Sequence, residues 1–133
     1  MQNNAMSTPE KEDLYFEARK TYDYFRIEGE TLDYNMLRGC LQTMARAKGT
    51  RKRRCVLVEN NYRESLSLAD LFRVIRDLPE IGFSQIHLAI ADPNPGHADI
   101  IEFANDVAGS RGLLMKAFSS VPDAEGWLTG CSN

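Results

Sequence analysis

The chain has 133 residues, of which 43% are hydrophobic and 26% are charged, and its formal net charge is −3. This length suits one domain with one core, and the composition excludes the apolar-poor, highly charged class of disordered chains. An acidic chain offers no long-range attraction to nucleic acid or to an anionic membrane. The sequence contains no run of about eighteen apolar residues, so it predicts no membrane span.

One domain is expected between two short tails. The first twelve residues, MQNNAMSTPEKE, are polar and contain neither the basic start nor the apolar stretch of a secretory signal. We therefore predict a flexible tail over residues 1–12, the domain over residues 13–130 and a C-terminal tail over residues 131–133.

The cysteine pattern indicates a cytoplasmic protein. Cys40, Cys55 and Cys131 are odd in number, lie far apart and include no CxxC pair, so the sequence predicts neither a zinc site nor a redox motif. A reducing compartment suits this cysteine usage. We expect no metal and no cofactor.

The first structured segment is predicted to be an antiparallel hairpin. Over residues 14–30 polar and apolar residues alternate in two runs, with aromatic and β-branched side chains at every second position. The turn is expected near residues 20–23, and Gly29 is expected at the exit of the second strand. Exposed aromatic side chains of this hairpin would suit a dimer contact.

A helix and a buried strand are predicted next. The helix, capped by Thr31 or Asp33, ends near Gly49. Its apolar stripe comprises Leu37, Cys40, Leu41, Met44 and Ala45. The following run CVLVEN, residues 55–60, is almost wholly apolar at its start, which is typical of a central strand buried on both faces. A loop is expected over residues 60–67.

Two further strand and helix pairs complete the chain. The second helix begins after Ser67 and is closed by Pro79, and the strand QIHLAIAD, residues 85–92, follows it. A third helix, over which Ile100, Phe103, Ala104, Val107 and Ala108 form the buried stripe, stops at Gly109 or Gly112. The strand LLMKAF and a short helix opened by Ser120 end the domain.

The predicted order of elements is ββαβαβαβα. Alternating strands and helices predict an α/β fold with a mostly parallel sheet, joined here to the starting hairpin. We therefore expect a five-stranded mixed sheet with amphipathic helices packed on it.

The C-terminal half resembles a known family of this shape. The residues that carry the resemblance are Ile101-Glu102-Phe103-Ala104, Val107-Ala108, Arg111-Gly112, Phe118, Ala124 and Trp127-Leu128. This pattern is similar to that of the STAS-like domains related to bacterial anti-sigma-factor antagonists, in particular their uncharacterised bacterial branch. The resemblance covers roughly residues 14–129. It implies the fold and a family of regulators, transporter appendages and binders of small or lipid-like molecules.

The resemblance also implies a possible phosphorylation site. Regulatory members carry a phosphorylated serine, within an Asp-Ser-Gly type motif, at the start of the helix that follows a central strand. Ser65 and Ser67 stand in this region here, but neither has the preceding Asp or the following Gly. Phosphate at a helix start would meet free backbone amides; serine is also a common purely structural helix cap.

A ligand site is predicted where the parallel strands end. Ligands of open α/β sheets gather outside the carboxyl ends of the strands. The candidate residues, which offer hydrogen-bonding groups and a cation, are Asn60, Asn61, Tyr62, Arg63, Asp92, Asn94 and His97. An anion or a small polar ligand would fit them. The alternative is that these residues serve only as loop formers.

Other candidate residues indicate little chemistry. His97 is expected in a loop, with neither a nucleophile nor a carboxylate to orient it, in a solvent-exposed or capping role. The basic residues of the stretch 48–54 are expected to form a solvated loop, because no aromatic residues are interleaved with them as in nucleic-acid sites.

These observations favour a non-enzymatic, STAS-like regulatory or protein-interaction module of a bacterial cytoplasm, acting through a protein partner or its own copy. The alternative is a carrier or sensor of a small or lipid-like molecule that binds at the strand-end loops. An enzyme would need a nucleophile and base pair that the sequence does not display.

Overall fold

A computed structural model describes residues 14–51 and 53–131, without the side chains of residues 48–51. The predicted tail over residues 1–12 lies outside what is described, as do residue 52 and the side chains of residues 48–51 in the basic stretch. The first helix continues to Arg51 instead of ending near Gly49, so the first part of the basic stretch is helical and not the predicted loop. The elements, in chain order, are β1 (Leu14–Ala18), β2 (Asp23–Thr31), α2 (Tyr34–Arg51), β3 (Cys55–Glu64), α3 (Leu68–Leu78), a π-helical turn (Pro79–Phe83), β4 (His87–Ala91), a 3₁₀ turn (Pro95–His97), α4 (Ala98–Ser110), β5 (Met115–Phe118) and α5 (Val121–Leu128).

The five strands form one mixed sheet in the order β1-β2-β3-β4-β5. β1 pairs with β2 in antiparallel fashion, and the other three pairs are parallel. β3 is the central strand, and its first four residues, Cys55 to Val58, are buried. The predicted α/β class, strand number and mixed sheet are confirmed.

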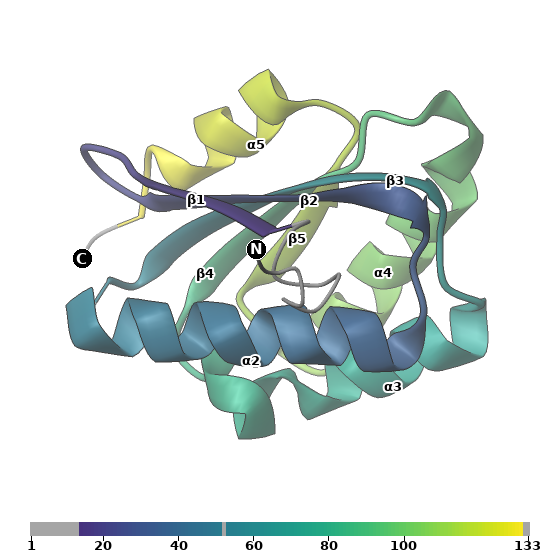
Figure 1. Cartoon of the computed structure of the whole chain (residues 1–133), viewed down its shortest axis with the longest axis horizontal. Helices are drawn as coiled ribbons and strands as arrows, with labels where there is room; N and C mark the ends of the chain where they lie inside the picture. Colours follow the sequence, from purple (N-terminus) through teal and green to yellow (C-terminus); the bar gives the residue numbers. More distant parts are fainter. Residues whose placement is uncertain (1–13, 52, 132–133) are drawn as a thin grey trace, which may run out of the picture.

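The helices are divided unequally between the two faces of the sheet (Figure 1). α2, α3 and α4 cover one face, whereas α5 covers the other face alone. The main core lies beneath the three helices, and its buried sheet residues are Phe25, Ile27, Val56, Val58, Tyr62, Leu88 and Ala117. The smaller core beneath α5 contains Tyr22, Tyr24, Cys55, Leu57, Ala89 and Ala91.

β2 and β3 run further than the sequence pattern predicts. The stretch from Asn60 to Glu64 belongs to β3 and not to a loop, because β2 is long enough to pair with it as far as Thr31. Gly29 lies inside β2, opposite Tyr62, and is not at the strand exit. A β-carbon at Gly29 would lie 2.6 Å from the Tyr62 ring, so glycine is required for that ring to lie across the strand.

The predicted helix ends agree in part with the structure. Asp33, and not Thr31, accepts the first-turn amide of α2 at Met36 (2.9 Å), and Ser67 accepts the amide of Asp70 (3.1 Å). α3 ends at Leu78 with Pro79 as its C-cap, as predicted. The chain does not leave the helical conformation there, because Pro79 keeps helical backbone angles and begins the π-helical turn.

An asparagine of α4 binds the edge strand β5. The Asn105 amide group donates to the Ala117 carbonyl oxygen (3.0 Å), and its side-chain oxygen accepts the Ala117 amide (2.7 Å). One side chain thus satisfies both outward-facing backbone groups of an edge-strand residue. The two bonds fix α4 against β5.

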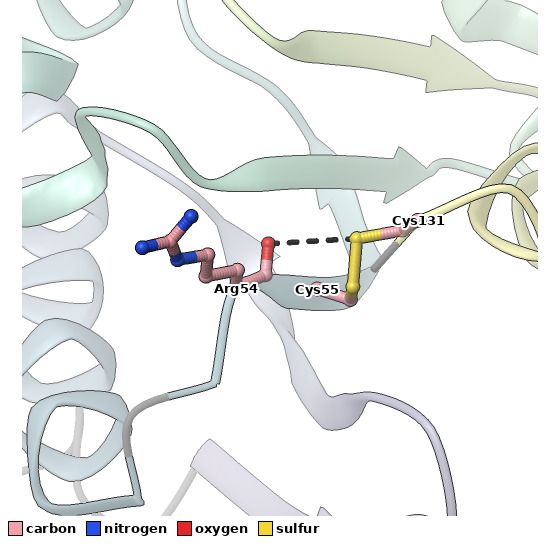
Figure 2. The surroundings of a disulfide bond; sticks show 3 residues. All are labelled: Arg54, Cys55 and Cys131. Carbon is pink, nitrogen blue, oxygen red and sulfur yellow. Dashed lines mark hydrogen bonds between the residues drawn. A yellow bond between two sulfur atoms is a disulfide. The ribbon is translucent and has the colours of Figure 1, made fainter. Parts of the chain in front are cut away.

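A disulfide bond joins Cys55, the first residue of β3, to Cys131, which follows α5 (Figure 2). The Cys131 sulfur lies 3.8 Å from the carbonyl oxygen of Arg54. The sequence did not predict this bond, because the three cysteines were interpreted as suited to a reducing compartment. It closes a separation of 76 residues, and a link of this span stabilises a fold by about 4 kcal/mol in the chain-entropy account.

A partly buried carboxylate connects α2 to α3. Asp77 accepts hydrogen bonds from Tyr34 (3.0 Å), Arg38 (2.9 Å) and Arg76 (3.1 Å). Burial alone would raise the pKa of Asp77, but the hydrogen bonds from Arg76 and Tyr34 and the charges of Arg76 and Arg38 lower it below its ordinary value. The ionised form of Asp77 therefore stabilises the contact between the two helices.

We predict that Asp77→Asn lowers the free energy of unfolding by about 1–3 kcal/mol at neutral pH. Because the folded pKa of Asp77 is depressed, the difference from the parent is complete above the unfolded pKa of about 3.9 and is lost as pH falls through the folded value. Urea unfolding from neutral to acidic pH measures it. Asp106→Asn, on the exposed side of α4, is the matched control. A deficit in Asp77→Asn that does not shrink in acid would contradict the assignment.

Candidate functional site

The candidate site lies at a step in the sheet. β4 ends at Ala91, which is opposite Glu59 of β3, whereas β3 continues to Glu64. The loop after β4 folds back against this projecting part of β3: the Asn94 amide group donates to the Arg63 carbonyl oxygen (3.2 Å). The two segments that the sequence predicts to be neighbours are therefore in contact.

The loop after β4 is anchored by a buried pair. The side chains of Asp92 and His97 are 5% and 9% exposed, and His97 Nδ1 lies 2.8 Å from Asp92 Oδ2. The other ring nitrogen, Nε2, lies 3.2 Å from the Arg63 carbonyl oxygen. The prediction of an exposed or capping His97 without a carboxylate partner was wrong, because the 3₁₀ turn directs the imidazole inward against Asp92.

The predicted site residues lie around two different hollows, and Asn60 borders both of them. Asn61, Tyr62, Arg63 and Asn94, together with Asn60 and Pro93, line an open depression at the step. Arg63 is exposed and lies 3.8 Å from Glu30, and the buried Tyr62 supports the floor across Gly29. This depression is too open to enclose a small ligand.

Asn60 and Asp92 also border a second, less open hollow. A cavity of about 80 Å³ lies between the sheet and helices α2, α3 and α4. We call it the helix–sheet cavity; its apolar lining residues are Ile27, Leu32, Leu37, Leu41, Val58, Leu66, Leu71, Val74, Ile75, Leu78, Leu88, Ile90, Ile100, Ile101, Ala104, Met115 and Ala117. The polar residues at its border are Asn60, Ser65 and Asp92.

The two candidate phosphorylation sites occupy different positions. Ser65 borders the helix–sheet cavity, whereas the Ser67 hydroxyl is the N-cap of α3. Ser67 thus has the structural role that was the alternative to phosphorylation. Phosphorylation of either residue stays a prediction.

The apolar walls of the cavity were not predicted from the sequence. Helical periodicity identified most of these side chains as core residues, which is their ordinary role. The small residues of the cavity wall are Ala104 of α4 and Ala117 of β5. Nothing in the local pattern marked Asn105 as the residue that binds β5.

Comparison with known proteins gives no matching family model and no matching curated protein. The STAS-like resemblance therefore stays a prediction. Among the described residues, no three His, Cys, Asp or Glu side chains are arranged to hold a metal ion. None of the helices in that part of the chain has the length and apolar character needed to cross a bilayer.

We predict that His97→Phe lowers the free energy of unfolding by about 3 kcal/mol, because it leaves the Asp92 carboxylate buried without its partner. Adding Asp92→Asn removes that charge, so the double variant should be more stable than His97→Phe alone. Chemical denaturation of the four proteins in this cycle measures the coupling. Asn61→Ala, which removes one part-buried side-chain hydrogen bond to Glu59 outside this loop, is the control. Strictly additive losses would refute the pairing.

Proposed function

We propose that the chain is a non-enzymatic, STAS-like binding module whose ligand is a small apolar molecule held in the helix–sheet cavity. The observation that carries the proposal is a partly open, almost wholly apolar cavity between the sheet and the helices. Protein interiors are close-packed, and voids larger than a water molecule are few. Apolar voids stay dry and take up apolar guests.

The position of the cavity also supports a binding role. Its polar border lies at the carboxyl ends of β3 and β4, where ligands of open α/β sheets gather. Asp92, the first residue of the loop between β4 and α4, borders this end of the cavity, and the loop contains no regular strand or long helix. Irregular loops of this kind are the segments that open most readily to admit a ligand.

We predict that filling the cavity abolishes ligand uptake without weakening the fold. Ala117→Val adds two methyl groups at the cavity wall and should leave the free energy of unfolding unchanged or raise it by about 1 kcal/mol. Ala91→Val, the matched change beneath α5 where Ala91 is fully buried, should instead cost about 1–3 kcal/mol through overpacking.

The readout is backbone amide NMR of both variants with a short apolar probe, 1-chlorobutane. The parent and Ala91→Val should show saturable shifts at residues around the cavity, and Ala117→Val should show none. Uptake by Ala117→Val equal to that of the parent, or a parent that does not respond, would overturn the proposal.

A protein-interaction role is the second candidate, favoured by the edge strand β1. Tyr15 and Phe16 are 44% and 38% exposed on this strand. An exposed strand edge with apolar side chains is a template for pairing with a second chain. The proposed partner is a second copy of this chain, paired edge to edge through β1.

We predict that Tyr15→Lys shifts the chain from dimer to monomer, because a charge on an edge strand opposes pairing. Sedimentation velocity across a concentration series measures the mass. Leu114→Lys, which replaces an equally exposed apolar residue away from β1, should leave the dimer intact. A parent chain that is monomeric at every concentration would exclude this candidate.

The proposal assigns the module to a bacterial cytoplasm. Its partners are expected not to be nucleic acids, because the net charge of the chain is −3. The disulfide between Cys55 and Cys131 weighs against that compartment, because cytosolic thiols are kept reduced.

A further inference from the structure

The polar border of the helix–sheet cavity indicates which ligands the cavity would accept. This inference rests on the proposed function and deepens it. Glu59 of β3 pairs with Ala91 of β4, so the next residues, Asn60 and Asp92, follow at equivalent positions of adjacent strands. Both border the cavity, together with Ser65 from the segment between β3 and α3. The polar groups are thus gathered at one end of an apolar space.

The hydrogen-bonding capacity at this end is only partly used. Asp92 accepts from the amide of Asn94 (3.2 Å) and contacts His97 (2.8 Å), whereas a carboxylate can accept about four hydrogen bonds. The Asn60 side-chain oxygen accepts the Tyr62 amide (3.1 Å). In the part of the chain that is described, the Asn60 NH₂ group and the Ser65 hydroxyl group donate to no other residue.

The charge at this end excludes ionic ligands. No lysine, arginine or histidine side chain is among the described residues that line the cavity. An anionic head group would therefore meet the Asp92 carboxylate without a compensating cation. An ammonium group would lose its hydration in a mostly apolar space, next to a carboxylate that already contacts His97.

We infer that the helix–sheet cavity binds a small neutral molecule with an apolar body and one hydroxyl group. The ligand hydroxyl donates to the Asp92 carboxylate and accepts a hydrogen bond from the Ser65 hydroxyl. The apolar body lies against the wall formed by Ile75, Leu88 and Ala104. A volume of about 80 Å³ restricts that body to a short chain or a small ring, since liquid water occupies about 30 Å³ per molecule.

A matched series of four-carbon probes tests this inference on the intact chain. The probes are 1-butanol, butyrate, butylamine and 1-chlorobutane, and amide NMR titration at neutral pH measures each dissociation constant. We expect 1-butanol to bind at least about tenfold more tightly than butyrate and butylamine, because a buried unpaired charge costs more than one hydrogen bond contributes.

The variant Ser65→Ala tests the hydrogen bond itself. It should raise the dissociation constant of 1-butanol by about fivefold, the effect of one ordinary hydrogen bond, and leave the dissociation constant of 1-chlorobutane unchanged. Ser119→Ala, outside the cavity lining, should change neither. Because Ser65→Ala removes one oxygen atom from a half-buried site, its amide spectrum shows directly whether the fold is kept.

The outcomes separate this inference from the proposed function. If 1-chlorobutane binds but butyrate or butylamine matches 1-butanol, or if Ser65→Ala weakens 1-butanol and 1-chlorobutane equally, the ligand class is wrong and the apolar cavity stands. If no probe binds, the proposed function fails and the ligand class fails with it.

Discussion

The two hydrogen bonds between Asn105 and Ala117 determine how the helix layer meets the sheet. They hold α4 beside β5. Ala104 of α4 and Ala117 of β5, which both line the cavity, are small. Large residues on α3 and β4 keep the neighbouring contacts apart, so the layer cannot collapse onto the alanines. The helix–sheet cavity is the space that this geometry leaves.

The unequal lengths of the parallel strands place the mouth of the cavity. β3 continues beyond Ala91, the last residue of β4, so the loop after β4 must fold against the side of β3. The buried pair of Asp92 and His97 and the contacts to the Arg63 carbonyl oxygen hold it there. The same loop also brings the Asp92 carboxylate to the border of the cavity, which is the basis of the proposed preference for a ligand that donates a hydrogen bond.

Most of the fold was predicted because helices and strands that bury one face carry apolar residues at regular spacings in the sequence. The apolar run at the start of β3 indicated the central strand, and Ser67 marked the start of α3 through ordinary capping chemistry. The extension of β3 was not predicted, because its residues are as polar as those of a loop. They form a strand only because they pair with β2. The pairing of Cys55 with Cys131 also escaped prediction, because three cysteines do not define a connectivity. Voids depend on the sizes of residues distant in sequence, so the cavity left no local pattern.

A crystal structure of the parent chain under xenon pressure tests the central claim most directly, because xenon enters apolar voids that are open to exchange. The account predicts xenon density between α3, α4 and the sheet, beside Ile75, Leu88 and Ala117. A core without xenon, with the helix layer closed onto the two alanines, would contradict it.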